Sequence, residues 1–301
     1  MQGLKSRGGD KVSAHCAVAD WGTSSFRLWL MAEDGSVLGE RRSTEGLVSA
    51  EGRFEPTLEG HLAALGAPEH LPVIICGMAG ARSGWREAAY LTAPCALADV
   101  PGAAVRVEGI ARDVRILPGI SQAEPSDVMR GEETQLLGLK TEGTICLPGT
   151  HSKWATIHAG RVEKFSTWMT GELFAVLSEH SLLSADVVGV VGPNEDFLAG
   201  LDSVLDEPES LTNALFGLRA RALLGKGGGE ASRLSGMLIG AELVGVGPVD
   251  HVTLVADDGL GDLYAAALEE IGTPVTRVDA TRTTQAGLFR AAREIWKTEA
   301  V

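Results

Sequence analysis

The stretch Asp20-Trp21-Gly22-Thr23-Ser24-Ser25 follows a short apolar run, Cys16 to Ala19, and the pattern around it decides the fold. Halfway along the chain, the apolar run Thr144 to Leu147 leads into Pro148-Gly149-Thr150-His151-Ser152-Lys153. A second strand-like run, a turn and a third run follow each of these polar stretches. The same series of strand, glycine- and hydroxyl-bearing loop, strand, turn and strand is therefore predicted in each half, which indicates two similarly built domains.

Between these repeats the pattern alternates between helix and strand. A helix is expected over 128–139, with Ser126 as its cap, and a last helix over about 283–296, which we expect to pack on the N-terminal domain. Further apolar runs predict strands at 73–76, 252–255 and 274–278. This alternation is typical of the α/β class.

The domains are expected at residues 16–143 and 144–301, after a flexible polar tail at 1–15. The tail lacks the apolar segment of a secretory signal, and the four cysteines lack metal or redox spacing, so a cytoplasmic protein with reduced thiols is expected. A net charge of −14 argues against nucleic acid as a partner. No apolar run reaches the length of a membrane span.

Both loops have the composition of a phosphate site, because glycine lets the backbone approach an anion and consecutive N–H groups and hydroxyls supply donors. Asp20, at the end of the first strand, could hold Mg²⁺ directly or through water. A Walker motif and a GxGxxG fingerprint are both missing, so two loops from two domains are expected to hold a nucleotide. The expected phosphate-binding residues are Asp20, Gly22, Thr23, Ser24, Gly149, Thr150, Ser152 and Lys153.

The repeated loops resemble those of the superfold of actin and hexokinase, whose members bind ATP between two related domains. This resemblance implies a two-domain actin-like ATPase (ribonuclease H-like) fold with its active site in the interdomain cleft. A closer resemblance, from about residue 18 to residue 293, is to the 2-dehydro-3-deoxygalactonokinase family. Its segments are Asp20-Trp-Gly-Thr23, Gly77-Met-Ala-Gly80 with Gly84-Trp85, Val128-Met-Arg-Gly-Glu-Glu-Thr-Gln135, Pro148-Gly-Thr-His-Ser-Lys-Trp154, Met169-Thr-Gly-Glu-Leu173 and Leu238-Ile-Gly-Ala-Glu242.

The family resemblance implies that ATP and Mg²⁺ are used to phosphorylate the 6-hydroxyl of 2-dehydro-3-deoxy-D-galactonate, a step of galactonate catabolism. The products would be 2-dehydro-3-deoxy-6-phosphogalactonate and ADP. Sugar kinases of the superfold carry their catalytic base, an aspartate, on a helix shortly before the second loop. Glu132 occupies that position here, and Glu133 is the alternative.

The N-terminal domain is expected to hold most of the substrate site. Arg82 and Arg130 are the candidates for binding the substrate carboxylate, because a guanidinium can pair with it through two hydrogen bonds. The backbone N–H groups of a helix beginning near Thr170 could bind substrate oxygens. The expected substrate-binding residues are Gly80, Arg82, Trp85, Arg130, Thr170, Gly171 and Glu172.

The adenosine site is expected in the C-terminal domain, after the strand at 252–255, at Ala256, Asp257 and Gly259. Family members carry glycine and small hydroxyl residues there, whereas this chain has two adjacent carboxylates, Asp257 and Asp258. Two alternatives to the function stay open: a kinase of the same fold for another sugar acid, and a nonenzymatic nucleotide sensor. The expected partners are ATP and a small sugar acid, and the sequence is compatible with a homodimer.

Overall fold

The computed structural model describes residues 13–298, which form two compact units. Unit 1 consists of residues 13–89, 100–119 and 285–298, and unit 2 of residues 90–99 and 120–284. The last helix therefore joins unit 1, whereas residues 120–143, expected in the N-terminal domain, lie in unit 2. Residues 1–12 of the expected tail lie outside the described residues, and Ala14 and His15 already belong to the first strand.

Unit 1 contains a six-stranded mixed sheet in the order β3-β2-β1-β4-β8-β7 within the described residues. Strand β1 pairs antiparallel with β2 and parallel with β4, so its carboxyl end lies beside that of β4. The strands are β1 Ala14–Trp21, β2 Phe26–Ala32, β3 Val37–Ser43, β4 Val73–Gly77, β7 Val105–Arg106 and β8 Val114–Ile116. The helices of this unit are α1 Leu47–Ala50, α2 Phe54–Ala64, the short η1 Met78–Gly80 and the part of α10 from residue 285.

Unit 2 contains a second six-stranded sheet in the order β15-β14-β11-β12-β13-β6 and a small sheet in the order β10-β9-β5, counted within residues 13–298. Strand β11 pairs antiparallel with β12 and parallel with β14. The strands are β5 Leu91–Thr92, β6 Cys95–Ala96, β9 Ile120–Gln122, β10 Asp127–Met129, β11 Gly143–Leu147, β12 Ser152–His158, β13 Arg161–Trp168, β14 Val252–Val255 and β15 Val275–Val278.

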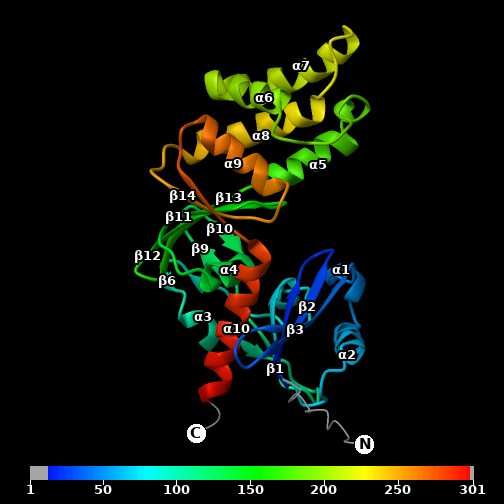
Figure 1. Cartoon of the computed structure of the whole chain (residues 1–301), viewed down its shortest axis with the longest axis vertical. Helices are drawn as coiled ribbons and strands as arrows, with labels where there is room; N and C mark the ends of the chain where they lie inside the picture. Colours follow the sequence, from blue (N-terminus) through cyan, green and yellow to red (C-terminus); the bar gives the residue numbers. More distant parts are fainter. Residues whose placement is uncertain (1–12, 299–301) are drawn as a thin grey trace, which may run out of the picture. The chain divides into compact units, whose positions relative to one another are not determined.

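In Figure 1, helices α5 to α9 gather on one side of the large sheet of unit 2, and α4 lies on the other side. They are α4 Glu132–Gly138, α5 Thr170–His180, η2 Leu182–Ala185, α6 Glu195–Asp206, η3 Pro208–Ser210, α7 Leu211–Leu223, α8 Glu230–Val246 and α9 Leu260–Glu270. Helix α3 Asp99–Gly102 and helix α10 Ala280–Thr298 each contain residues of both units. No helix within the described residues is long and apolar enough to cross a membrane.

The two large sheets share one construction. In unit 1, β3, β2 and β1 are antiparallel neighbours, and β4 and β8 continue in parallel from β1. In unit 2, β13, β12 and β11 are the antiparallel neighbours, and β14 and β15 continue in parallel from β11. The repeat that the sequence predicts is therefore confirmed as two α/β units whose sheets share the order of five strands. The sixth strand differs: it is β7 beside β8 in unit 1 and β6 beside β13 in unit 2. The polar loop of each unit connects corresponding strands, β1 to β2 and β11 to β12.

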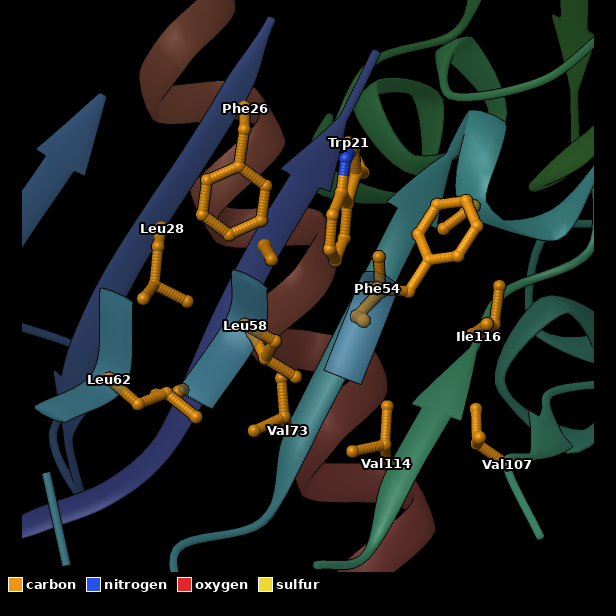
Figure 2. Packing of buried hydrophobic residues seen from close by; sticks show 14 of the residues in the cluster. Trp21, Phe26, Leu28, Phe54, Leu58, Leu62, Val73, Val107, Val114 and Ile116 are labelled. Carbon is orange, nitrogen blue, oxygen red and sulfur yellow. The ribbon is translucent and has the colours of Figure 1, made fainter. Parts of the chain in front are cut away.

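The core of unit 1 lies between the sheet and helix α2. Leu58 and Leu62 are one helical turn apart and almost fully buried, and they face Leu28 and Val73 of the strands (Figure 2). Trp21, at the carboxyl end of β1, packs edge to face on Phe26 with ring centroids 4.6 Å apart. Burial of such apolar side chains supplies the main favourable free energy of folding.

Helix α10 covers the opposite side of the unit 1 sheet, behind the side chains labelled in Figure 2. The indole N–H of Trp296 donates to Asp113 Oδ2 at 3.0 Å, which fixes the end of the helix next to β8. The turn at Asp34-Gly35 is the predicted hairpin, and Gly35 has a φ of +85°. A Cβ at residue 35 would lie 2.9 Å from the ring of Phe289, so glycine serves both the turn and the contact with α10.

The helix predicted over 128–139 is wrong in its first third, and so is Ser126 as its cap, because the N-cap is Gly131. Residues 127–129 form strand β10, and the helix begins at Glu132. Asp127 explains the strand, because its carboxylate accepts hydrogen bonds from the backbone N–H of Thr167 at 2.7 Å and from its hydroxyl at 2.6 Å. Gly131 then adopts a φ of +112°, a conformation that separates the strand from the helix and that other residues rarely adopt.

Candidate active site

The first loop, residues 20–25, is closed on itself and held by the start of α1. The N–H of Gly22 donates to Ser25 O at 2.8 Å, and the N–H of Leu47 donates to Gly22 O at 2.9 Å. A Cβ at Gly46 would lie 2.4 Å from Thr23 O, so a glycine is needed for this contact. The side chains of Thr23 and Ser24 are exposed, which leaves their hydroxyls on the open side of the loop.

Asp20, the predicted metal-binding residue, lies at the end of β1 and is ion-paired. Its Oδ2 accepts from Arg27 Nη2 at 2.7 Å and from Arg27 Nε at 3.2 Å. Its Oδ1 lies 3.7 Å from the Sγ of Cys76. The guanidinium therefore occupies one carboxylate oxygen, and the other oxygen is the one that could meet a cation or its water. The described residues contain no cluster of three or more His, Cys, Asp or Glu side chains arranged to hold a metal ion.

The second loop packs against the N-terminus of α5. The N–H of Glu172 donates to Thr150 O at 2.9 Å. A Cβ at Gly171 would lie 2.5 Å from Gly149 O and 2.9 Å from Thr150 Cα, so the close approach needs a glycine. The structure thus brings together Gly149, Thr150 and the predicted helix start at Thr170. Unpaired N–H groups and the dipole of a helix N-terminus favour an anion such as phosphate.

Ser152 differs from its expected role, because it is fully buried. Its hydroxyl lies 2.6 Å from the hydroxyl of Tyr264 in α9, on the inner side of the loop. His151 is exposed and pairs with Glu172 through Nε2 and Oε2. Of the loop residues predicted to contact phosphate, Gly149 and Thr150 are accessible to solvent. Ser152 is not, and its hydroxyl instead attaches the loop to α9 through Tyr264.

Lys153 and Glu132 are 21 residues apart in sequence and form an ion pair, with Nζ 3.2 Å from Oε1. Lys153 is almost fully buried, and its ammonium also donates to His151 O at 3.2 Å. Glu132 is the first residue of α4, and its Oε2 accepts from the N–H of Arg130 at 3.0 Å. The predicted base and the predicted phosphate-binding lysine are therefore neighbours.

Glu133, the alternative base, has a different environment. It is fully buried, and its carboxyl group accepts from the N–H of Gly131 at 2.7 Å and from the hydroxyl of Thr134 at 2.9 Å. Burial, together with the negative charge of Glu132, raises the pKa of Glu133 from 4.5 to about 8. The side chain thus closes the turn at the start of α4 and does not reach solvent.

The predicted substrate-binding residues of unit 1 are divided between its core and its surface. Gly80 is buried and its carbonyl accepts from the N–H of Ala88 at 3.0 Å. Trp85 is partly buried and stacks on Phe54, with ring centroids 6.0 Å apart and an interplanar angle of 9°. Arg82 is 93% exposed, and its Nε lies 3.7 Å from Glu87 Oε1.

Arg130 of unit 2 is held more firmly than Arg82. Its guanidinium carbon lies 4.4 Å from the ring centroid of Tyr90, which is a cation–π contact. The stacking keeps the guanidinium next to the backbone that begins α4, two residues before Glu132. Between the two arginines, Arg130 has the more defined geometry.

The predicted adenosine residues follow β14 as expected, but two of them serve the backbone. The N–H of Ala256 donates to Val278 O at 3.1 Å, and Gly259 caps α9 with a φ of +79°. Asp257 accepts from the N–H of Thr281 at 3.3 Å and from its hydroxyl, at the start of α10. The carboxylate of Asp257 is therefore directed to the first turn of α10.

A cavity of about 180 Å³ opens beside the second loop within unit 2. Its walls are mainly apolar and come from the loop, α5, α8, α9 and the segment before α6. Sequence reasoning missed most of these residues, because they come from distant segments of the chain. The lining residues are Gly149, Thr170, Gly171, Phe174, Val191, Ser235, Leu238, Ile239, Leu260, Leu263 and Tyr264.

Two units that share the order of five strands, each with a glycine- and hydroxyl-bearing loop between corresponding strands, define a two-domain actin-like ATPase fold. Among solved structures of low identity, component A of (R)-2-hydroxyglutaryl-CoA dehydratase from Acidaminococcus fermentans has a TM-score of 0.50 at 13% identity. That match covers 94% of this chain and 100% of the other, and it bears on the fold alone. The cavity of unit 2 lies beside the second loop, and the ion pair of Glu132 and Lys153 lies at the end of that loop.

Comparison with known proteins narrows this class to one family. A family model described as 2-keto-3-deoxy-galactonokinase matches residues 20–291. A Rhizobium meliloti protein named "Probable 2-dehydro-3-deoxygalactonokinase DgoK1" is 48% identical, over 95% of this chain and 99% of its own length. The 2-dehydro-3-deoxygalactonokinase of Escherichia coli is 33% identical over 94% of this chain and 99% of its own length.

A solved structure agrees with these sequences. The crystal structure of a Sinorhizobium meliloti protein assigned as a 2-dehydro-3-deoxygalactonokinase has a TM-score of 0.90 at 49% identity. The match covers 93% of this chain and 97% of that one. The chain belongs to the 2-dehydro-3-deoxygalactonokinase family, as its sequence motifs predict.

Proposed function

We propose that this chain transfers the γ-phosphoryl group of ATP to the 6-hydroxyl of 2-dehydro-3-deoxy-D-galactonate, giving 2-dehydro-3-deoxy-6-phosphogalactonate and ADP. Family membership over nearly the whole chain supports the reaction. The observation within the structure that carries it is the ion pair of Glu132 and Lys153, at 3.2 Å, beside a loop that offers backbone donors. A kinase needs these groups together, because phosphoryl transfer depends on positioning and on neutralising charge.

The nucleotide is proposed to bind with its base in the cavity of unit 2. The base would pack against Leu238, Ile239 and Leu263, and the phosphates would follow Gly149 to the N-terminus of α5. Gly149 lines the cavity and also belongs to the loop, so the two subsites are continuous. This placement moves the adenosine site from Ala256, Asp257 and Gly259 toward α8 and the start of α9. Thr23 and Ser24 of the first loop stay proposed as phosphate-binding residues.

Magnesium is proposed to arrive with ATP and to neutralise charge on the transferred group. Mg²⁺ in kinases keeps several waters and uses few protein carboxylates. Asp20 is the residue that would hold Mg²⁺, directly or through water, because only its Oδ2 is ion-paired with Arg27.

Glu132 is proposed as the general base. Its carboxylate would accept the proton of the substrate hydroxyl as the oxygen attacks phosphorus. Lys153 would hold that carboxylate in place and lend its charge to the phosphates. Glu133 stays the alternative base, but its full burial and its pKa of about 8 favour Glu132.

The substrate carboxylate is proposed to bind Arg130, whose guanidinium is oriented by Tyr90. Arg82 stays the second candidate. Trp85 is better explained by its packing on Phe54 than by contact with the sugar acid. Glu172 and Thr170 are proposed to shape the site through the start of α5.

We also propose a cytoplasmic location and a homodimer. A supply of ATP supports the location, as do the four cysteines, which all lie within the described residues, are buried and form no disulfide. The apolar side chains of Phe216, Leu223 and Leu224 are exposed on and after α7, which favours a protein partner such as a second copy. Light scattering of the pure protein tests the dimer.

Phosphorus NMR tests the reaction. The protein is incubated with Mg-ATP and 2-dehydro-3-deoxy-D-galactonate, and the product spectrum is recorded. The proposal predicts a new phosphate monoester whose resonance couples to the two protons on C6, together with ADP. An ester at another carbon, or ATP that stays intact, would contradict it.

A further inference from the structure

A buried carboxylate in helix α8 joins the elements around the second loop. Glu242 is 1% exposed. Its Oε1 accepts from the indole N–H of Trp154 at 2.7 Å, and its Oε2 accepts from the hydroxyl of Tyr264 at 2.7 Å. The hydroxyl of Thr170 also donates to Oε2. These donors belong to β12, α9 and α5, so one side chain of α8 fixes three other elements.

The bonds form a directed chain that ends in the second loop. The hydroxyl of Tyr264 donates to Glu242, so its oxygen is left to accept from Ser152, whose Oγ lies 2.6 Å away. Ser152 begins β12 directly after the loop. The position of the loop is therefore tied, through Tyr264, to a carboxylate that the nucleotide does not touch.

The charge of Glu242 suits this position. Within the described part of the chain, no Lys, Arg or His forms an ion pair with Glu242. Burial raises the pKa of Glu242 above its usual value, and the hydrogen bonds from Thr170, Trp154 and Tyr264 offset only part of that rise. Thr170 is the first residue of α5, so the carboxylate also lies at the positive end of that helix. The groups around Glu242 are donors, which an ionised carboxylate satisfies and an amide does not.

The residues bonded to Glu242 also line the proposed nucleotide site. Thr170 and Tyr264 form part of the cavity wall, next to Gly149 and Gly171. The cavity and the loop could move apart if α9, α5 and β12 shifted relative to each other. Glu242 accepts a hydrogen bond from each of these elements and is not itself a cavity-lining residue.

We infer that Glu242 is a positioning residue for ATP, which holds the base cavity and the second loop in the relative positions that one nucleotide requires. This inference rests on the proposed nucleotide placement. Glu242 acts through Tyr264, Thr170 and Ser152 and takes no part in the chemistry. The inference predicts that replacing Glu242 lowers the affinity for ATP and leaves the affinity for the sugar acid unchanged.

The test compares Glu242→Gln with Glu230→Gln. Glu230 is the control because it lies on the same helix, is 4% exposed and accepts a backbone N–H, that of Gly228 at 2.6 Å. It differs from Glu242 in that its Oε1 lies 3.8 Å from Arg221 Nε. For each variant, KM for ATP, KM for 2-dehydro-3-deoxygalactonate and Tm are measured. We expect Glu242→Gln to raise KM for ATP by roughly tenfold, from the loss of buried charge-assisted hydrogen bonds. KM for the sugar acid stays within about twofold, as in the control.

Tyr264→Phe gives a second test that does not depend on the folding of Glu242→Gln. It removes one hydroxyl from the chain of bonds, and the same selective rise in KM for ATP is expected. In the variant that carries both Glu242→Gln and Tyr264→Phe, KM for ATP should rise by less than the product of the two single increases, because both changes break one hydrogen-bond network. A rise in both KM values that follows the loss of Tm, as a general structural role would give, overturns the inference. So does an ATP affinity that neither variant changes.

Ser235→Phe separates this inference from the nucleotide placement. Ser235 lines the cavity, and a phenylalanine there fills empty apolar volume. If Ser235→Phe binds ATP as well as the native protein does, the placement is wrong and the inference falls with it. If Ser235→Phe loses ATP affinity while Glu242→Gln and Tyr264→Phe keep it, the placement stands and the inference alone is wrong.

Discussion

At the residue scale, the two adjacent glutamates at the start of α4 have opposite environments. Glu132 is paired with Lys153 and partly accessible, whereas Glu133 is fully buried and bonded to Gly131 and Thr134. Their positions in the sequence differ by one, which on a helix rotates the second side chain by roughly 100° from the first. This rotation turns Glu133 into the interior and leaves Glu132 beside the loop.

We predict that Glu132→Gln lowers kcat by about 100-fold or more, because the amide cannot accept the proton of the attacking hydroxyl. Affinity for ATP should change little. Steady-state kinetics and a binding titration of Mg-ATP check both statements. The matched control is Glu133→Gln, which is expected to keep most of the turnover. The reverse pattern, with turnover lost only in Glu133→Gln, would assign the base to Glu133.

The raised pKa of Glu133 also predicts that the stability of the folded chain depends on pH. Its pKa is about 8 in the folded chain and near 4.5 when unfolded. Between these values the folded state keeps a proton that the unfolded state releases, so the free energy of unfolding falls as pH rises. The slope from one such group is at most about 1.4 kcal/mol per pH unit.

Glu133→Gln removes this titration and keeps the shape of the side chain. We predict that the free energy of unfolding of Glu133→Gln, minus that of the native protein, increases from pH 5 to pH 8 and is constant above about pH 9. Urea unfolding at a series of pH values measures the difference. Parallel curves for the two proteins would show that Glu133 is ionised in the folded chain, contrary to this account.

At the element scale, α5 and the second loop depend on a close contact at Gly171. A Cβ there would lie 2.5 Å from a backbone oxygen, which cannot turn aside as a side chain would. We predict that Gly171→Ala displaces the loop and raises KM for ATP by roughly tenfold or more.

The control for Gly171→Ala is Gly217→Ala in α7, where a Cβ meets nothing within 4 Å. That variant should keep its KM and gain about 1 kcal/mol of stability from helix propensity. An unchanged KM in Gly171→Ala would mean that the loop does not hold the nucleotide.

Elements were predictable from the sequence where a local pattern dominates. The apolar runs 73–76 and 252–255 are buried strands, as their composition indicates. The helix expected over 128–139 failed because Asp127 bonds to Thr167, a partner 40 residues away. The loops were recognised as polar breaks after strands, but the burial of Ser152 depends on Tyr264, which no local pattern reveals. The cavity was missed for the same reason.

At the scale of the whole molecule, the repeat in the sequence corresponds to two sheets that share the order of five strands. Two loops with matching flanks were enough to predict this duplication. The division of the chain was less predictable, because residues 120–143 join unit 2 and residues from 285 join unit 1. A boundary drawn along the sequence cannot represent a chain that passes between units more than once. Family motifs, each longer than a chance match, carried the prediction of function.

The most direct test of the central claim is the release of ADP from Mg-ATP across a panel of 2-keto-3-deoxy sugar acids and neutral sugars. The account predicts strong stimulation by 2-dehydro-3-deoxygalactonate and none by the neutral sugars, because a guanidinium is expected to select the carboxylate. Stimulation by a different acid alone would keep the kinase and change its substrate. Slow ADP release that no sugar acid stimulates would contradict the account.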